Sequence, residues 1–157
     1  MLTPAERQNR IARLRSLPDQ IEALVQPLTP AQRTAVTLPG EWTVAQNVHH
    51  LADSHMNAYI RVRLMLTEDR PALKPYDQDE WAKLSDASAA DVTNSIALLR
   101  SLHARWCALF ESLQDDQWSR VGVRPDKEVT VEHILNTYAK HGEDHIDQIQ
   151  RTLAAGQ

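Results

Sequence analysis

Apolar residues recur every three or four positions along four long stretches of this 157-residue chain, the spacing of one face of an α-helix. Glycine is scarce, at four residues, and no run shows the strict alternation typical of a half-buried strand. We therefore predict an all-α fold, a four-helix bundle that occupies residues 1–157 as one domain. The predicted helices run from about Pro4 to Val25, Thr43 to Leu66, Ala89 to Leu113 and Val131 to Leu153.

The ends of these helices carry local signals. Thr43 and Gln46 match the S/T-x-x-E/Q capping box, and Thr130 is placed to cap the last helix. Pro18 lies inside the first helix, where we expect it to kink the backbone. The second and third helices are joined by a proline-containing segment that is too long for a tight turn. We predict that this segment is one long crossover connection at one end of the bundle, and that only a loop joins the third helix to the fourth.

The composition excludes several classes of function. The net charge is −4 and basic and acidic residues are interleaved, whereas a nucleic-acid surface shows a basic stripe. No run of about 18 apolar residues could span a membrane, and the first residues lack the build of a secretion signal. The one cysteine, Cys107, fits a small buried side chain in the reducing cytoplasm. We expect a cytoplasmic protein whose partner is a small molecule, with no nucleic-acid or membrane partner.

Two of the seven histidines form a pair in the last predicted helix. His141 and His145 are four residues apart, so their side chains lie on one face, one turn from each other. That face is the apolar stripe of the helix and also carries Val131, Ile134, Tyr138, Gly142 and Ile149. The glycine between the two histidines indicates close approach by a neighbour or a ligand. The imidazoles are either core side chains satisfied by hydrogen bonds or ligands of a metal ion, and their spacing alone leaves both interpretations open. His133 faces the opposite, solvated side.

The second helix offers two further candidates that periodicity does not separate. His55 falls within the apolar stripe of the helix, whereas His50 lies along a stripe of small and polar residues. The other members of that polar stripe are Asn47, Ser54, Ala58 and Arg61. A polar stripe on a helix surrounded by neighbours can line an internal cavity. His103 lies on the apolar stripe of the third helix, where a hydrogen-bonded core histidine is the favoured interpretation and a pocket residue the alternative.

Longer runs of the sequence add a resemblance. Residues 40–57 read GEWTVAQNVHHLADSHMN, and residues 70–77 read RPALKPYD. Together with residues 98–106 and 138–149, these runs resemble the DinB/YfiT-like superfamily, and more closely its YfiT-type branch of candidate metal-dependent hydrolases and bacillithiol S-transferases. In that family, three histidines from two helices bind one divalent metal ion, most often assigned as zinc or nickel. The resemblance implies that the metal ligands of this chain are His50, His141 and His145.

The resemblance also implies a chemistry. Three protein ligands leave a coordination position open, and a metal bound in this way lowers the pKa of a coordinated thiol or water. We expect an enzyme that activates a low-molecular-weight thiol, such as bacillithiol, for S-transfer to electrophilic substrates, with Arg61, Tyr76 and His103 as candidate pocket residues. The alternatives are a hydrolase that uses hydroxide generated at the metal, a thiol-dependent isomerase of the maleylpyruvate kind, and a non-catalytic metal-binding stress-response protein. A homodimer is compatible with the resemblance.

Overall fold

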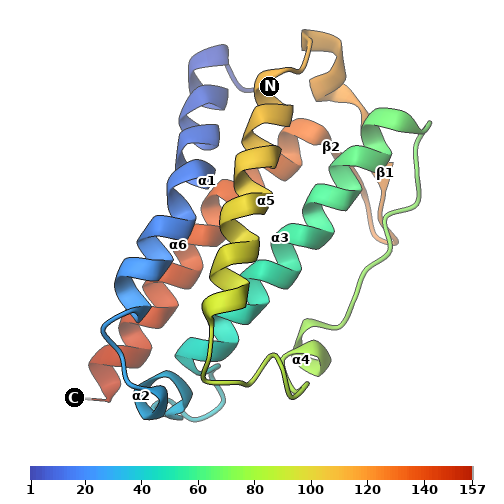
Figure 1. Cartoon of the computed structure of the whole chain (residues 1–157). Coiled ribbons are helices and arrows are strands. Elements are labelled where there is room, and N and C mark those ends of the chain that lie inside the picture. Colours follow the sequence, from blue (N-terminus) through green and yellow to red (C-terminus); the bar gives the residue numbers. More distant parts are fainter. Residues whose placement is uncertain (157) are drawn as a thin grey trace.

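Four long helices pack side by side in the computed structural model, which describes residues 1–156 (Figure 1). They are α1 (Pro4–Val25), α3 (Val44–Thr67), α5 (Thr93–Glu111) and α6 (Val131–Ala155). The prediction of an all-α four-helix bundle is confirmed. Within the described residues, no helix is both long enough and apolar enough to cross a membrane.

Polar side chains set where the helices begin. The side chain of Thr43 accepts a hydrogen bond from the backbone of Gln46, whose own side chain accepts one from the backbone of Thr43, so the predicted capping box is present. Thr130 caps α6 in a similar way by accepting from the backbone of His133. The predicted bounds of the third helix were too wide, because α5 begins only at Thr93, whose backbone N–H donates to Asp91, and ends at Glu111.

Helices that are consecutive in the sequence are not always neighbours in space. α1 packs along α5 and α6, and α3 packs along the same two helices, so α1 and α3 lie diagonally across the bundle (Figure 1). α3 and α5 run in the same direction, and the chain must therefore return along the bundle between them (Figure 1). Residues 68–92, which include the short helix α4 (Gln78–Trp81), make this return. The predicted long crossover is present, but it follows the side of the bundle instead of crossing one end.

Short elements complete the fold. Helix α2 (Pro30–Thr34) follows α1, and the 3-10 helix η1 (Asp115–Ser119) follows α5. The segment between α5 and α6, predicted as a loop, also contains an antiparallel hairpin of strands β1 (Val121–Val123) and β2 (Glu128–Thr130). Strands of three residues are too short to show an alternating pattern, and the prediction was wrong here for that reason.

The interior is apolar along most of its length but also contains a polar strip. Cys107 is buried beside Trp106 in the apolar core, as predicted. Because α3 packs against both α5 and α6, more than one of its faces points inward. Its polar stripe is buried as a result, and comprises Asn47, His50, Ser54, Ala58 and Arg61. This stripe therefore lines the interior and does not face solvent.

A glycine allows α6 to approach α1 closely. A Cβ atom added to Gly142 would lie 2.6 Å from Cδ2 of Leu17, which is well inside van der Waals contact. The predicted close approach at Gly142 is confirmed, and the approaching group is a side chain of α1.

Candidate metal centre

Three imidazoles from two helices meet at the interface of α3 and α6. Nε2 of His141 lies 3.4 Å from Nε2 of His50 and 3.1 Å from Nε2 of His145. One donor nitrogen from each residue lies within 4.8 Å of the other two. His50 and His145 are buried, and His141 is half-buried. The structure thus brings together the three histidines that the family resemblance implied.

Asn47 determines which nitrogen of His145 carries the proton. Nδ1 of His145 lies 2.7 Å from Oδ1 of Asn47, and the amide nitrogen of Asn47 donates to the carbonyl oxygen of Thr43 at 2.9 Å. Because the amide nitrogen is engaged with a carbonyl, it is the amide oxygen that faces the imidazole, and this oxygen can only accept. The proton of His145 is therefore on Nδ1, and its Nε2 carries a lone pair.

His55 lies behind His141. Nε2 of His55 is 3.1 Å from Nδ1 of His141, the ring nitrogen that does not face the other two histidines. His55 is fully buried, in agreement with its place in the apolar stripe of α3. Both histidines that periodicity left open on α3 are therefore interior, but only His50 belongs to the cluster of three.

Burial keeps the three clustered imidazoles neutral. Burial, with a smaller contribution from neighbouring histidines, lowers the pKa of His50 and that of His141 from the ordinary 6.5 to about 3. Burial likewise lowers the pKa of His145 to about 4. At neutral pH these rings are uncharged and can offer lone pairs to a cation.

This donor set fits a divalent metal ion. Nε2 of His145, which carries a lone pair, lies 3.1 Å from Nε2 of His141, and one donor nitrogen of His50 lies within 4.8 Å, an arrangement that a cation between them would satisfy. With Zn–N bonds of 2.0–2.1 Å and tetrahedral angles, neighbouring ligand nitrogens lie roughly 3.3 Å apart. The two observed separations, 3.1 Å and 3.4 Å, are close to this value. Three imidazoles suit zinc, nickel, cobalt, iron and copper, so the geometry admits any of these.

A hollow of about 390 Å³ opens onto the imidazoles. The indole of Trp42 forms one wall, with its ring centre 4.6 Å from that of His50 and 6.2 Å from that of His145. The hollow is lined by Gly40, Glu41, Trp42, His50, Gln78, Asp79, His141, His145 and Gln148. A small molecule entering it would meet the three ring nitrogens directly.

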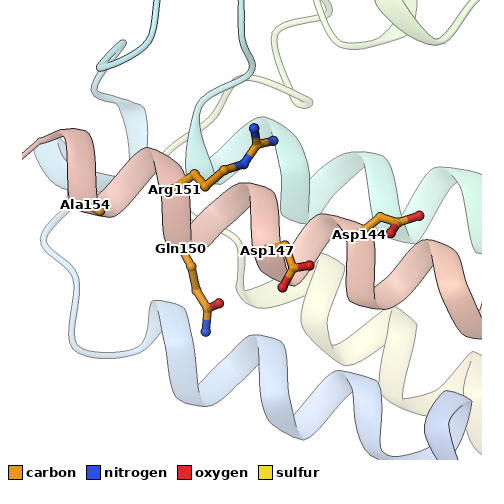
Figure 2. Close-up of a pocket in the computed structure, with 5 residues that line it drawn as sticks. All are labelled: Asp144, Asp147, Gln150, Arg151 and Ala154. Carbon is orange, nitrogen blue, oxygen red and sulfur yellow. The ribbon is translucent and has the colours of Figure 1, made fainter.

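A larger surface hollow, of about 650 Å³, lies along the outer side of α6 (Figure 2). Its lining residues are Asp144, Asp147, Gln150, Arg151 and Ala154, all from one helix. A ligand site normally has polar groups that converge from several elements around an enclosed volume. The smaller hollow meets that description, and we therefore take it as the candidate site.

Glu41 is a candidate functional residue that the sequence reasoning missed. It lines the hollow, and its Oε2 atom is buried with no hydrogen-bond partner among the described residues. The guanidinium of Arg151 forms an ion pair with that oxygen at 3.8 Å, which is beyond hydrogen-bond length. A carboxylate that lines a hollow can accept a proton from a bound molecule. Helical periodicity does not predict where the side chain of a loop residue points. The sequence signal for Glu41 was its place in the family-like run of residues 40–57, two residues before the cap of α3.

The three predicted pocket residues lie in two different places. Arg61 and Tyr76 are neighbours, with the guanidinium carbon 6.0 Å from the ring centre of Tyr76, and Arg61 donates to the carbonyl oxygen of Lys74 at 2.7 Å. Burial raises the pKa of Tyr76, and a hydrogen bond with Ser54, one turn along α3 from His50, partly opposes this. His103 lies deeper, almost fully buried, with Nε2 2.8 Å from Nδ1 of His55. None of the three lines the hollow itself.

Two relatives of known sequence resemble this chain over most of its length. YfiT of Bacillus subtilis (strain 168), named as a candidate metal-dependent hydrolase, is 44% identical over 138 residues, which cover 87% of this chain and 78% of that protein. A similarly named protein of Geobacillus kaustophilus (strain HTA426) is 42% identical over 147 residues, covering 92% of this chain and 82% of that protein.

Solved structures give the same relationship. The structure of B. subtilis YfiT, described as a four-helix bundle of unusual topology, matches with a TM-score of 0.93 and 40% identity over 97% of this chain and 88% of that one. A mycothiol-dependent maleylpyruvate isomerase shares the fold, with a TM-score of 0.64 and 18% identity over 95% of this chain and 63% of that one. The family model of the DinB superfamily matches residues 13–149. The chain therefore belongs to the DinB superfamily.

Proposed function

We propose that this chain is a metal-dependent enzyme in which His50, His141 and His145 hold one divalent ion, zinc or nickel, and that it activates a low-molecular-weight thiol for transfer to an electrophilic substrate. The observation that carries the proposal is the convergence of three neutral imidazole nitrogens on the wall of an open hollow. Three protein ligands leave a coordination position for a molecule from the hollow, as in catalytic sites. The names of the relatives support the dependence on metal.

The residues around the hollow have separate tasks in this reaction. The metal, when bound, supplies a lowered pKa to a coordinated thiol. The carboxylate of Glu41, which lines the hollow, accepts the thiol proton. The sulfur then forms a bond to the electrophilic carbon, and the leaving group departs with its electron pair. Trp42 forms an apolar wall that excludes water from one side of the reacting atoms.

Recognition of the thiol is assigned to Arg61 and Tyr76. Arg61 is buried, and its hydrogen bond goes to a neutral carbonyl, which leaves its charge without compensation from that partner. A guanidinium of this kind binds carboxylate groups well. Tyr76 lies on the crossover segment that also contributes Gln78 and Asp79 to the hollow.

Hydrolysis is the second candidate. Two carboxylates, Glu41 and Asp79, line the hollow, and a hydrolase needs such a group as a base for water. The relatives' names also point to a hydrolase. In this reaction water replaces the thiol, and the same three histidines hold the metal. The two candidates differ in whether turnover requires a thiol.

The deciding experiment measures metal content and turnover together. Purified protein is analysed for metals and assayed with a fluorogenic bimane halide with and without bacillithiol, and separately with an activated ester. We expect about one metal ion per chain and turnover that depends on bacillithiol, both lost in His145→Ala. His133→Ala is the matched control, because His133 lies on the same helix but is exposed.

Other results would favour a different function or contradict the metal site. Ester cleavage without a thiol requirement would favour the hydrolase, and bound metal without either activity would favour a non-catalytic metal-binding protein. A metal content unchanged by His145→Ala would contradict the proposed site itself.

A further inference from the structure

A proline frees a buried backbone carbonyl in the middle of α1. The helix continues through Pro18, which has no N–H to donate to the carbonyl oxygen of Leu14 four residues earlier. Leu14 is almost fully buried, so this oxygen needs another partner. His103 of α5 supplies it, because its Nδ1 lies 2.6 Å from the oxygen of Leu14. A carbonyl oxygen only accepts, and the proton of His103 is therefore on Nδ1.

The tautomer of His103 fixes the tautomers of the two histidines hydrogen-bonded after it. With its proton on Nδ1, neutral His103 presents a lone pair on Nε2, 2.8 Å from Nδ1 of His55. His55 must donate through Nδ1, which leaves a lone pair on its Nε2, 3.1 Å from Nδ1 of His141. His141 must in turn donate through Nδ1, and its lone pair is left on Nε2, the nitrogen that faces His50 and His145.

These tautomers require all three rings to be neutral, since a doubly protonated ring would donate at both nitrogens. Burial provides this condition. His55 and His103 have almost no exposed surface, and a charged ring there would lose its hydration. His141 cannot carry a proton on Nε2 while that nitrogen binds a metal ion. One carbonyl oxygen on α1 therefore determines the tautomers of three histidines on three helices.

We propose that the Leu14 carbonyl, His103 and His55 are positioning groups that hold His141 with its Nε2 lone pair directed at the metal, and that Pro18 is the residue that makes this carbonyl available. The inference rests on the proposed metal site but not on the reaction carried out there. Without these hydrogen bonds, His141 is free to carry its proton on Nε2, and in that form it cannot ligate through Nε2. His145 is held independently by Asn47.

Nitrogen-15 NMR of the imidazole rings in zinc-loaded protein at pH 7.5 reads the tautomers directly. We expect His55, His103 and His141 all to carry the proton on Nδ1. A proton on Nε2 of His55 or His103 would overturn the proposal. This measurement requires neither turnover nor a variant, so it stands even if the proposed reaction is wrong.

Zinc affinity tests whether the hydrogen bonds from Leu14 to His141 strengthen metal binding. We expect His103→Leu to weaken zinc binding about 10- to 100-fold, the effect typical of losing a group that orients a ligand. His49→Leu is the matched control: His49 is also buried, and its nitrogens bond Ser95 and the carbonyl oxygen of Ala89, away from the cluster. We expect its zinc affinity to equal that of the wild type. A folded His103→Leu protein with wild-type zinc affinity would refute the positioning role, and if this variant does not fold, the tautomers of the wild type decide.

Discussion

Asn47 holds His145 in its ligating form, and its replacement by leucine removes that support while keeping the same branching and number of side-chain heavy atoms. The Oδ1 atom of Asn47 accepts from Nδ1 of His145 at 2.7 Å, and Asn47 has no exposed surface. The substitution also removes hydrogen bonds to the carbonyl oxygens of Thr43 at 2.9 Å and Trp42 at 3.4 Å, but the Thr43 oxygen keeps the backbone N–H of residue 47 at 3.1 Å. The main loss is therefore the partner of the imidazole.

The size of the effect follows from this geometry. A buried N–H left without a partner costs about 1–3 kcal/mol. In the metal-free variant His145 can avoid that cost by moving its proton to Nε2, but in the metal-bound form Nε2 is occupied and the unpaired N–H on Nδ1 is unavoidable. The cost then falls on metal binding. At about 1.4 kcal/mol per factor of ten, zinc affinity is expected to fall roughly 10- to 100-fold.

The assay is a zinc titration in competition with a chromophoric chelator at pH 7.5, with circular dichroism to verify folding. Asn57→Leu is the control, because the Asn57 amide donates to the carbonyl oxygen four residues earlier on α3, as that of Asn47 does, but contacts none of the three histidines. Its zinc affinity is expected to change less than twofold. A folded Asn47→Leu protein that binds zinc as tightly as the wild type would refute the reasoning. Equal weakening in both variants would assign the effect to α3 as a whole.

Four further results are expected. The metal-free protein should lose stability as the pH falls from about 6.5 toward 4, because burial lowers the folded-state pKa of His103 to about 4 and only the unfolded chain takes up the proton in between. Each such histidine contributes up to about 1.4 kcal/mol per pH unit. An unfolding free energy in urea that does not change over this pH range would contradict the prediction. Pro18→Ala should raise the unfolding temperature, since alanine is favoured inside helices, and shift the Nδ1 proton resonance of His103 by competition for the carbonyl. Gly142→Ala should lower the unfolding free energy by about 1 kcal/mol through overpacking against Leu17, and Leu17→Ala in the same chain should recover part of the loss. Glu41→Gln should slow turnover at least about tenfold with zinc content unchanged, and an unchanged rate would remove Glu41 as the proton acceptor.

Much of the fold could be predicted from the sequence because its signals are local. The capping box of Thr43 and Gln46 located the start of α3, and the recurrence of apolar residues every three or four positions located four helices. The direction of the crossover could not be predicted, because it depends on α3 and α5 being parallel, which no local pattern encodes. The short hairpin at residues 121–130 was missed for a different reason, since its strands are too short to show a period.

The candidate site was likewise predictable from the sequence only where the signal was local. The spacing of His141 and His145 placed both on the inner face of one helix, and the structure agrees. Periodicity could not choose between His50 and His55, because α3 buries two of its faces and both side chains point inward. The choice came from the family resemblance. The connection from His103 to Leu14 could not be foreseen, because it joins residues 89 positions apart.

The diagonal placement of α1 and α3 has a consequence for folding kinetics. Of the consecutive long helices, only α3 and α5 pack closely within the described residues, and they are parallel, so no helical hairpin can form early and guide the rest. The contact between His50 and His141 spans 91 positions, and the entropy of closing so long a loop is recovered only when most of the bundle has assembled. The interactions at the metal centre are therefore largely absent from the transition state, and such interactions slow unfolding without accelerating folding. A bound ion thus prolongs the lifetime of the folded chain and does not hasten its formation.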